Sequence, residues 1–239
     1  MENKMKVEIW SDVMCPFCYI GKRKFESALN ALSQKDSIEV VWHSFQLNPY
    51  IQFKPGRDSY SYLAEIKGQS RDWSVSIHDN LAQSAKGIGL DFNFEKAKIA
   101  NSFDAHRVIQ LAKKYSLTNE IEERFFRAYF TDGELISDHA TLIRLATEVG
   151  LPKEEVIKVL ENNLYAAEVR SDGAEAQRMG ASGVPFFVID RKFAVSGAQD
   201  TIVFTETLQK AFAAWEENNP EAIQEHLSGQ TCTTDGECK

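Results

Sequence analysis

The chain of 239 residues is 43% hydrophobic and 11% aromatic, enough for one large domain or for a small domain with a sizeable insertion. Its formal net charge of -8 and its pI near 5.2 argue against nucleic acid or an anionic membrane as partners. No apolar run approaches a transmembrane span and no secretory signal precedes the first strand, so we expect a cytoplasmic protein unless a leader has been removed.

The first predicted strand, residues 6–11 (KVEIWS), leads into Cys15-Pro16-Phe17-Cys18 and then into an amphipathic helix. Pro16 suits the first helical position, which places Cys15 at or beside the N-cap. There the free backbone N–H groups and the helix dipole favour an anion, and the thiolate is the nucleophile in disulfide exchange. Cys18 follows one turn later and can close a disulfide with Cys15. The arrangement predicts a redox site.

Zinc binding is the main alternative, because Cys-x-x-Cys also supplies half of a four-ligand site. The other ligands would come from Cys232 and Cys238, whose spacing is wider than usual, or from the histidines at positions 43, 78, 106, 139 and 226. The proline inside the motif and its place between strand and helix favour redox chemistry. We therefore expect no bound metal.

Residues 38–45 (IEVVWHSF) predict a second strand, so the chain begins β-α-β, with a parallel pair and a right-handed crossover. Hardly any strand signal follows until residue 180. The pattern predicts helices over residues 60–67, 75–86, 93–115, 119–130, 137–149, 152–162 and 165–179. Ser137 can cap the fifth of these, and Lys22, Arg23 and Lys24 on the first helix of the chain are expected to face solvent.

Strand character returns at residues 186–189 and 193–196, which predict an antiparallel hairpin before a closing helix over 201–215. The sequence therefore predicts an α/β protein with a thioredoxin-like fold (β-α-β … β-β-α) and a large all-helical insertion. The expected domains are a discontinuous thioredoxin-like domain (1–58 and 180–218), the insertion (59–179) and a C-terminal tail (219–239). A short helix near 220–227 and the pair Cys232 and Cys238 fall in this tail.

The loop before the hairpin carries a second signal in Val184-Pro185. In a thioredoxin-type domain this loop holds a cis-proline beside the redox pair, where the preceding backbone can pair with a bound peptide. A proline that merely begins an edge strand is the alternative. Because the dithiol stands at the other end of the same scaffold, we expect a cis Val184–Pro185 bond, with Pro185 in the site and Val184 contacting substrate.

Four motifs in order carry a resemblance: residues 11–21 (SDVMCPFCYIG), 45–49 (FQLNP), 101–107 (NSFDAHR) and 183–188 (GVPFFV). They resemble the FrnE-type branch of the DsbA family, within the thioredoxin superfamily, from about residue 5 to 215. The resemblance implies a protein-disulfide oxidoreductase or isomerase, with Cys15 as nucleophile and Cys18 as resolving thiol. Partners would be protein or small-molecule thiols and disulfides, without a cofactor other than glutathione as a co-substrate.

The same superfamily includes glutathione-dependent 2-hydroxychromene-2-carboxylate isomerases, which have a serine where Cys15 stands. A small-molecule isomerase or transferase is therefore the alternative function, and the presence of both cysteines argues against it. The periplasmic DsbA oxidant has a histidine between its cysteines, whereas Phe17 offers no charge or hydrogen bond. We therefore expect a less oxidising pair than that of DsbA, suited to a reductase or isomerase.

Weaker candidates are three polar residues of one predicted helix, Asn101, His106 and Arg107. They would either line a cleft under the insertion and contact substrate, or form a polar cluster between helices. The Cys232/Cys238 pair closes a short loop, so a disulfide there adds little stability. It is either a second redox pair that exchanges with Cys15 and Cys18, which we favour, or two idle thiols.

Overall fold

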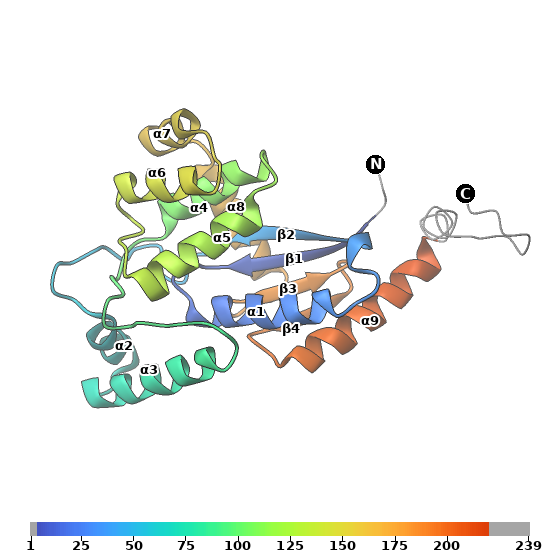
Figure 1. Cartoon of the computed structure of the whole chain (residues 1–239), viewed down its shortest axis with the longest axis horizontal. Coiled ribbons are helices and arrows are strands. Elements are labelled where there is room, and N and C mark those ends of the chain that lie inside the picture. Colours follow the sequence, from blue (N-terminus) through green and yellow to red (C-terminus); the bar gives the residue numbers. More distant parts are fainter. Residues whose placement is uncertain (1–3, 220–239) are drawn as a thin grey trace, which may run out of the picture.

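The computed structural model describes residues 4–219, and these contain a four-stranded mixed sheet in the order β2-β1-β3-β4 (Figure 1). The strands are β1 (Met5–Ser11), β2 (Ile38–Ser44), β3 (Phe186–Ile189) and β4 (Phe193–Ser196). β1 pairs in parallel with β2 and antiparallel with β3, and β3 and β4 form the predicted hairpin. The expected α/β thioredoxin-like architecture is confirmed.

One face of the sheet is covered by α1 (Pro16–Asn30) and α9 (Thr201–Asn218), which contact each other along their length (Figure 1). Three buried aromatic rings join the two helices to the sheet: Phe25 of α1 and Phe204 of α9 both contact Phe187 of β3. Aromatic pairs of this kind add to the free energy gained by burying their area. A short 3-10 turn, η1 (Lys35–Ser37), links α1 to β2.

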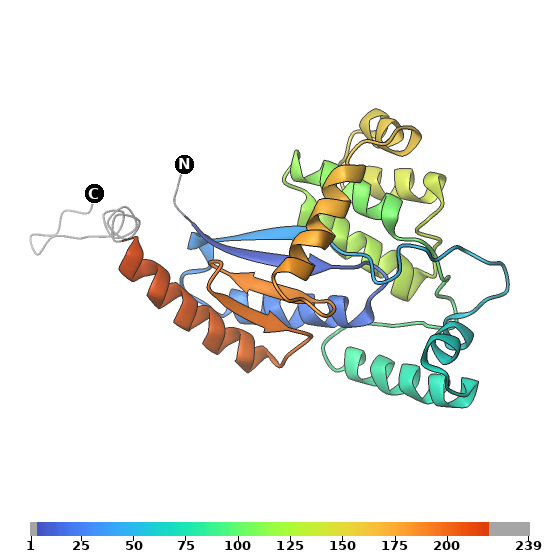
Figure 2. The ribbon, with the colours of Figure 1, turned by 180° about the vertical axis from the view of Figure 1, so that it is seen from behind.

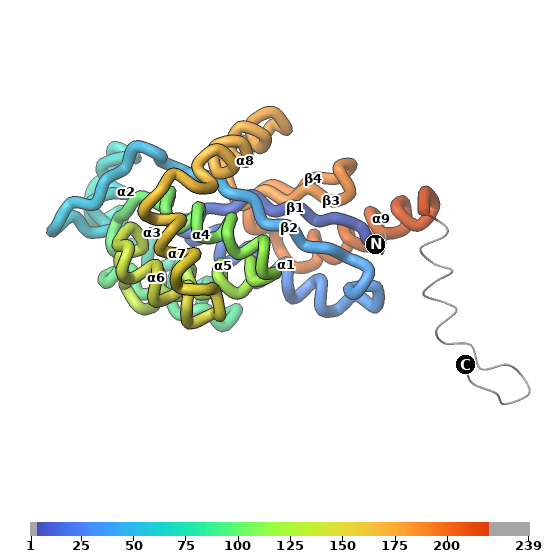
Figure 3. The backbone as a smooth tube through the Cα atoms, turned by 90° about the horizontal axis from the view of Figure 1, so that it is seen from above, coloured from blue at the N-terminus to red at the C-terminus, as the bar shows by residue number. Residues whose placement is uncertain are grey.

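The opposite face is covered by α8 (Ala166–Arg178), which contacts β1 and β2 (Figures 2 and 3). The indole N–H of Trp10 donates to the carbonyl of Asp172 at 2.9 Å, and Trp10 packs with Ala176, Phe186 and Val188. The sequence analysis grouped residues 165–179 with the insertion. In the structure this last helix of the block lies on the sheet.

The remaining helices form the insertion, in two groups at the N-terminal end of α1 (Figure 1). Their bounds are α2 (Ser59–Lys67), α3 (Arg71–Lys86), α4 (Phe103–Lys113), α5 (Thr118–Arg127), η2 (Ala128–Asp132), α6 (His139–Glu148) and α7 (Lys153–Glu161). The buried core of the insertion is continuous with Cys15, Cys18 and Tyr19, so the insertion packs directly on the dithiol end of α1.

Lys22 does not face solvent as expected, since its side chain is only 2% exposed. Its ammonium lies 2.6 Å from Glu26 and 2.8 Å from Glu123 of α5, and Arg23 also contacts Glu123 at 2.6 Å. The Tyr19 hydroxyl donates to the same carboxylate at 2.6 Å. Glu123 therefore links the insertion to α1. The periodicity of the sequence could not show that Lys22 has a partner about 100 residues away.

Three helix predictions were wrong in their starts. The helix expected over 75–86 already begins at Arg71 and is capped by Ser70, whose hydroxyl accepts the Trp73 N–H. The helix expected over 93–115 begins at Phe103, because the preceding backbone bonds elsewhere: the Asn93 N–H donates to the Phe130 carbonyl at 2.6 Å. The helix expected from Ser137 begins at His139 and is capped by Asp138, whose carboxylate accepts the Thr141 N–H. Residues 220–239, with Cys232, Cys238 and the expected short helix, lie outside the described residues.

Within residues 4–219, no helix combines the length and apolar character needed to span a bilayer.

Candidate active site

Cys15 is the N-cap of α1, with Pro16 at the first helical position, as the sequence predicts. The Cys15 carbonyl accepts the N–H of Cys18 at 3.0 Å, which begins the helix. No side chain caps this end and no acidic residue stands in its first turn, so Cys15 lies at the positive end of the helix dipole without a competing negative charge in that turn. Both cysteines are free thiols, 4% and 1% exposed.

The Val184–Pro185 peptide bond is cis, which confirms the prediction for this loop. The Cys15 Sγ donates to the Val184 carbonyl at 3.5 Å, so two segments 169 residues apart meet at the reacting sulfur. Gly21 makes this approach possible from within α1. A Cβ at position 21 would lie 2.8 Å from Cγ of Pro185, closer than real Cβ atoms come to other groups.

Cys18 is the more deeply buried thiol. Burial raises the pKa of Cys18 well above its ordinary value, and the hydrogen bond and charge of Cys15 add to the rise. The Asp12 backbone and the Ser11 hydroxyl act in the opposite direction, because both stabilise the Cys18 thiolate. The two thiols therefore differ in environment: one lies at a helix terminus facing a loop, and the other is held protonated beneath it.

Asp12 organises the loop that leads to Cys15. One carboxylate oxygen accepts the Met14 N–H at 3.2 Å, and the other accepts the Leu47 N–H at 2.8 Å. The Nε2 of His106 lies 3.4 Å from the first oxygen, so α4 of the insertion contacts the dithiol loop through this pair. Both side chains are fully buried, so water does not screen their interaction.

Glu122 of α5 is a buried carboxyl near this pair, and neither of its oxygens has a hydrogen-bond partner among the described residues. Burial raises the pKa of Glu122 to about 7; His106 and Lys22 oppose the rise, and Asp12 adds to it. Groups with pKa values shifted this far from the ordinary value are frequent at functional sites. Its position in the sequence gave no sign of this environment.

None of the three polar candidates, Asn101, His106 and Arg107, lines the cavity that contains Cys15. Asn101 holds the loop after β2, since its amide donates to the carbonyls of Pro49 and Ile51 at 2.9 and 3.0 Å. Arg107 is buried and donates to the carbonyls of Val159, Leu164 and Asn162. In the structure these hydrogen bonds join segments of the fold, and Asn101 also lines a separate surface pocket with Gln46 and Tyr50.

A cavity of about 620 Å³ opens beside Cys15, between the dithiol loop, α2, α3 and η2. Its walls are mostly apolar and aromatic, and its volume falls in the range of small-molecule sites. Cys15, Pro16 and Phe17 were expected in the site, but most other wall residues, among them Trp73 and Tyr129, could not be recognised from the sequence. They come from separate segments whose apolar patterns do not distinguish a cavity wall from a core.

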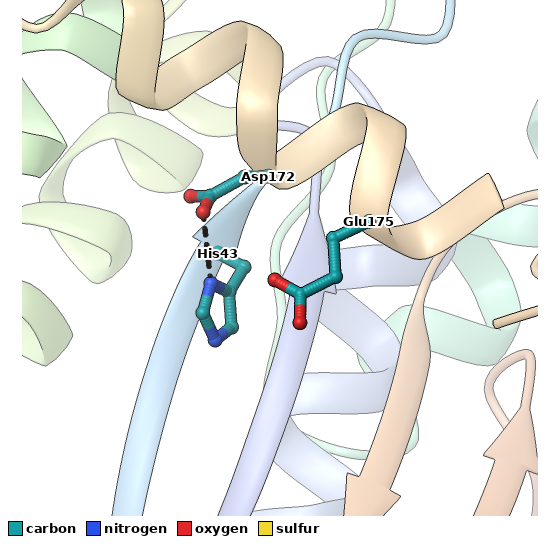
Figure 4. Close-up of side chains that lie close together, drawn as sticks. All are labelled: His43, Asp172 and Glu175. Carbon is teal, nitrogen blue, oxygen red and sulfur yellow. Dashed lines mark hydrogen bonds and ion pairs between the residues drawn. The ribbon is translucent and has the colours of Figure 1, made fainter. Parts of the chain in front are cut away.

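His43, Asp172 and Glu175 lie close enough together for a metal site, with ligand atoms within 4.8 Å of one another (Figure 4). Each already has a partner in the fold. Asp172 contacts Nδ1 of His43 at 3.0 Å and accepts the Ser44 N–H at 2.9 Å, while Glu175 pairs with Arg191 at 2.7 Å. We interpret the group as the polar contact that fastens α8 to β2.

Among residues 4–219, neither Cys15 nor Cys18 belongs to a group of three or more side chains with metal-ligand geometry. The described histidines have other partners: His43 contacts Asp172, His78 contacts Ser74, His106 contacts Asp12 and His139 contacts Asp104. The arrangement that remains is a pair of thiols, a facing loop and an adjacent apolar cavity. It can exchange disulfides.

Comparison with known proteins agrees with this geometry. The family model for the DSBA-like thioredoxin domain matches residues 6–209. The uncharacterized protein YwbO of Bacillus subtilis (strain 168) is 30% identical over 207 residues, covering 84% of this chain and 94% of that protein. The crystal structure of a probable DsbA oxidoreductase, SCO1869 from Streptomyces coelicolor, is similar with 40% identity and a TM-score of 0.82, covering 87% of this chain and 90% of that one. The cytosolic disulfide reductase DsbM from Pseudomonas aeruginosa shares the fold at 17% identity and a TM-score of 0.56, covering 89% and 98%.

Proposed function

Because the chain belongs to the DSBA-like thioredoxin domain family, whose members exchange thiols and disulfides, we propose that it is a thiol–disulfide oxidoreductase acting through Cys15 and Cys18. The observation that carries the proposal is the contact between the Cys15 sulfur and the carbonyl before Pro185, at the N-terminus of α1. An anion is stabilised at this end of the helix, and a substrate sulfur can approach beside the loop.

The reaction in the reducing direction uses the two thiols in turn. The Cys15 thiolate attacks one sulfur of a substrate disulfide, forms a mixed disulfide and releases the other sulfur as a thiolate. The Cys18 thiol then loses its proton and attacks the Cys15 sulfur, which closes the Cys15–Cys18 disulfide and releases the second substrate thiolate. Two electrons pass from the dithiol to the substrate, and the two product thiolates take up the proton released by Cys18 and the proton that Cys15 gave up when it ionised. An external thiol restores the dithiol.

The environment of each cysteine supports this division of roles. Cys15 stands at the helix terminus and lines the cavity, so it is the thiol that a substrate reaches. Burial raises the pKa of Cys18 well above the ordinary value and keeps this thiol protonated. Cys18 therefore does not attack the substrate disulfide itself and reacts only after the mixed disulfide has formed.

Phe17 sets the expected direction of exchange. It is half exposed and has no hydrogen-bonding group or charge to hold the Cys15 thiolate. The reduced form is then less stabilised than in the periplasmic oxidant DsbA, and a less oxidising pair suits a reductase or an isomerase. The structural neighbour DsbM is described as a cytosolic disulfide reductase and has been solved with glutathione, which supports a place in the cytoplasm with a thiol donor such as glutathione.

The test is catalysed reduction of insulin by dithiothreitol, together with equilibrium titration against glutathione. Cys15→Ser should abolish catalysis, and Cys18→Ala should accumulate the mixed disulfide at Cys15. DsbA has a reduction potential of about -120 mV. The potential of this protein should be well below that value, and Phe17→His should raise it. A potential near that of DsbA for the unaltered protein would contradict the proposed direction. Turnover of an aromatic substrate with glutathione that survives Cys18→Ala would favour the isomerase instead.

The tail supplies a second pair, Cys232 and Cys238, outside the described residues. We assign it to exchange with the Cys15–Cys18 disulfide, in the role of an internal reductant. Replacing both tail cysteines by serine should slow multiple-turnover insulin reduction and leave the first turnover unchanged. If the variant matched the unaltered protein in multiple turnover as well as in the first turnover, the tail thiols would be idle.

A further inference from the structure

The cavity beside Cys15 offers apolar contact and almost no charge. Leu63, Leu81 and Phe94 are among its walls. Of the residues from 4 to 219 that line it, Lys67 is the one cation and none carries a carboxylate. Burial lowers the pKa of His78, so this imidazole is neutral at neutral pH. A ligand that carries several charges would lose its hydration here without finding partners.

Two polar atoms in these walls have no hydrogen-bond partner among the described residues. The Nδ1 of His78 lies 2.8 Å from the Ser74 carbonyl, which fixes the proton on Nδ1 because a carbonyl only accepts. Nε2 of His78 is therefore an acceptor, and no protein donor reaches it. The Tyr129 hydroxyl, on the π-helical turn η2, is likewise without a protein partner. π-helical turns of this kind are frequent at functional sites.

The apolar surface continues from the cavity to the rim. Phe17, Leu47, Ile66 and Ile77 all line it, and each is between 40% and 52% exposed. Large apolar side chains gathered on one surface are unusual in a protein without a ligand there. Cys15 lines the same cavity and is only 4% exposed. The geometry thus directs an apolar group toward the reacting sulfur.

We propose that this cavity binds the apolar substituent of a low-molecular-weight disulfide and places its sulfur against Cys15, while Nε2 of His78 and the Tyr129 hydroxyl bind one uncharged polar group on that substituent. The proposal rests on the proposed function and names its substrate class. A polypeptide main chain does not suit the cavity, because each residue brings an N–H and a carbonyl that these walls leave unpaired. The two carboxylates of glutathione would face Lys67 alone.

The experiment compares two reagents that share one reactive group, benzyl methanethiosulfonate and 2-sulfonatoethyl methanethiosulfonate. In each case the Cys15 thiolate displaces methanesulfinate and forms a mixed disulfide with the remaining fragment. The full chain carrying Cys18→Ala keeps that disulfide, and peptide mapping reads modification at Cys15 separately from the tail cysteines. Each rate is divided by the rate of the same reagent with N-acetylcysteine, which removes intrinsic reactivity.

Cys15 should favour the benzyl reagent by about tenfold or more after this correction, since burying an aromatic ring exceeds the free energy of a tenfold preference. Ile77→Glu, on the cavity wall, should reduce the preference to about threefold or less. Ile202→Glu, on the exposed side of α9 and outside the cavity, should leave it unchanged. Equal corrected rates for the two reagents in the Cys18→Ala chain would overturn the proposal.

A second comparison tests the two polar atoms. A 4-hydroxybenzyl reagent should react faster than the benzyl reagent, and His78→Phe should remove that difference while keeping the preference for aromatic over charged reagents. Two cysteine peptides, one with leucine and one with serine beside the cysteine, are compared in the same way. If the rates differed between these peptides but not between the small reagents, the proposal would be overturned in favour of polypeptide substrates. These rates need only Cys15, so they are independent of turnover: failure of the unaltered chain to reduce any disulfide, small or protein, in a Cys18-dependent way would refute the proposed function, whereas equal corrected rates would refute the cavity assignment.

Discussion

Gly21 of α1 and Pro185 of the facing loop are packed so closely that a single methyl group does not fit between them. A Cβ at position 21 would lie 2.8 Å from Cγ of Pro185 and 3.4 Å from the ring of Phe187. The ring of Pro185 is rigid and cannot move aside alone, so the loop that meets the Cys15 sulfur would shift as a unit.

Gly21→Ala is therefore expected to slow disulfide exchange severalfold or more. Alanine is favoured over glycine inside a helix by about 1 kcal/mol, which offsets part of the cost of the clash. The free energy of unfolding should change little or fall, while the single-turnover rate with insulin falls clearly. The two readouts together distinguish displacement of the loop from loss of the fold.

Gly173→Ala on α8 is the matched control. Gly173 is also inside a helix, and a Cβ there meets nothing within 4 Å. This variant should gain roughly 0.5–1 kcal/mol in the free energy of unfolding, measured in urea, with unchanged exchange. If Gly21→Ala behaved like Gly173→Ala in both measurements, the close contact between Gly21 and Pro185 would not be required for disulfide exchange.

The release of the mixed disulfide should depend on pH through Cys18. Its pKa is raised well above the ordinary value, chiefly by burial. Formation of the mixed disulfide neutralises Cys15 and removes that contribution, but the burial remains. The fraction of Cys18 thiolate, and with it the release rate, should rise about tenfold per pH unit between pH 6 and 8.5. Stopped-flow release of a fluorescent thiol measures the rate, and a plateau below pH 8 would contradict the assignment.

Asn101 distinguishes a structural role from substrate contact. Its amide donates to the carbonyls of Pro49 and Ile51, and its oxygen accepts from Gln46 at 3.0 Å and from the Phe103 N–H at 2.9 Å. Asn101→Ala leaves these groups unpaired, so we expect a loss of about 2–3 kcal/mol in the free energy of unfolding. KM for a small disulfide should stay within about twofold, measured below the melting transition. A large rise in KM without loss of stability would instead assign Asn101 to substrate binding.

Local chemistry made the dithiol and its facing loop predictable from the sequence. Pro16 between two cysteines and Val184-Pro185 before a buried strand are short signals whose structural meaning does not depend on distant residues. The strands followed from β-branched and aromatic runs. What could not be predicted depends on long-range contacts: the N–H of Asn93 bonds Phe130 in place of a helix, and Lys22 is buried because Glu123 reaches it.

The cavity was beyond prediction for a related reason. Trp73, His78 and Tyr129 belong to α3 and η2, and each looks like a core residue of an amphipathic helix. Whether such a residue faces a packed core or a hollow is decided by how α2 and α3 sit against α1. That arrangement is a tertiary property, and periodicity in one sequence does not encode it.

Glu122 should make the stability of the protein depend on pH with the opposite sign to most carboxylates. Burial raises its pKa to about 7 in the folded chain, against about 4.3 when unfolded. The folded state therefore binds this proton more tightly, so the contribution of Glu122 to stability is complete below about pH 4. It is lost as the pH rises to about 7. The loss amounts to roughly 3 kcal/mol.

Glu122→Gln cannot ionise, so its stability relative to the unaltered protein should increase across this pH range. Urea unfolding at pH 4.5, 5.5, 6.5 and 7.5 measures the difference, which should be small at pH 4.5 and near its full value at pH 7.5. Glu123→Gln is the neighbouring control. Burial acts to raise the pKa of Glu123, but the Lys22 charge and the hydrogen bonds from Lys22 and Tyr19 outweigh it and lower the pKa. Its contribution is therefore present at neutral pH and lost on acidification, so Glu123→Gln should be most destabilising at pH 7.5. A difference for Glu122→Gln that stays constant from pH 4.5 to 7.5 would show that this carboxyl titrates elsewhere.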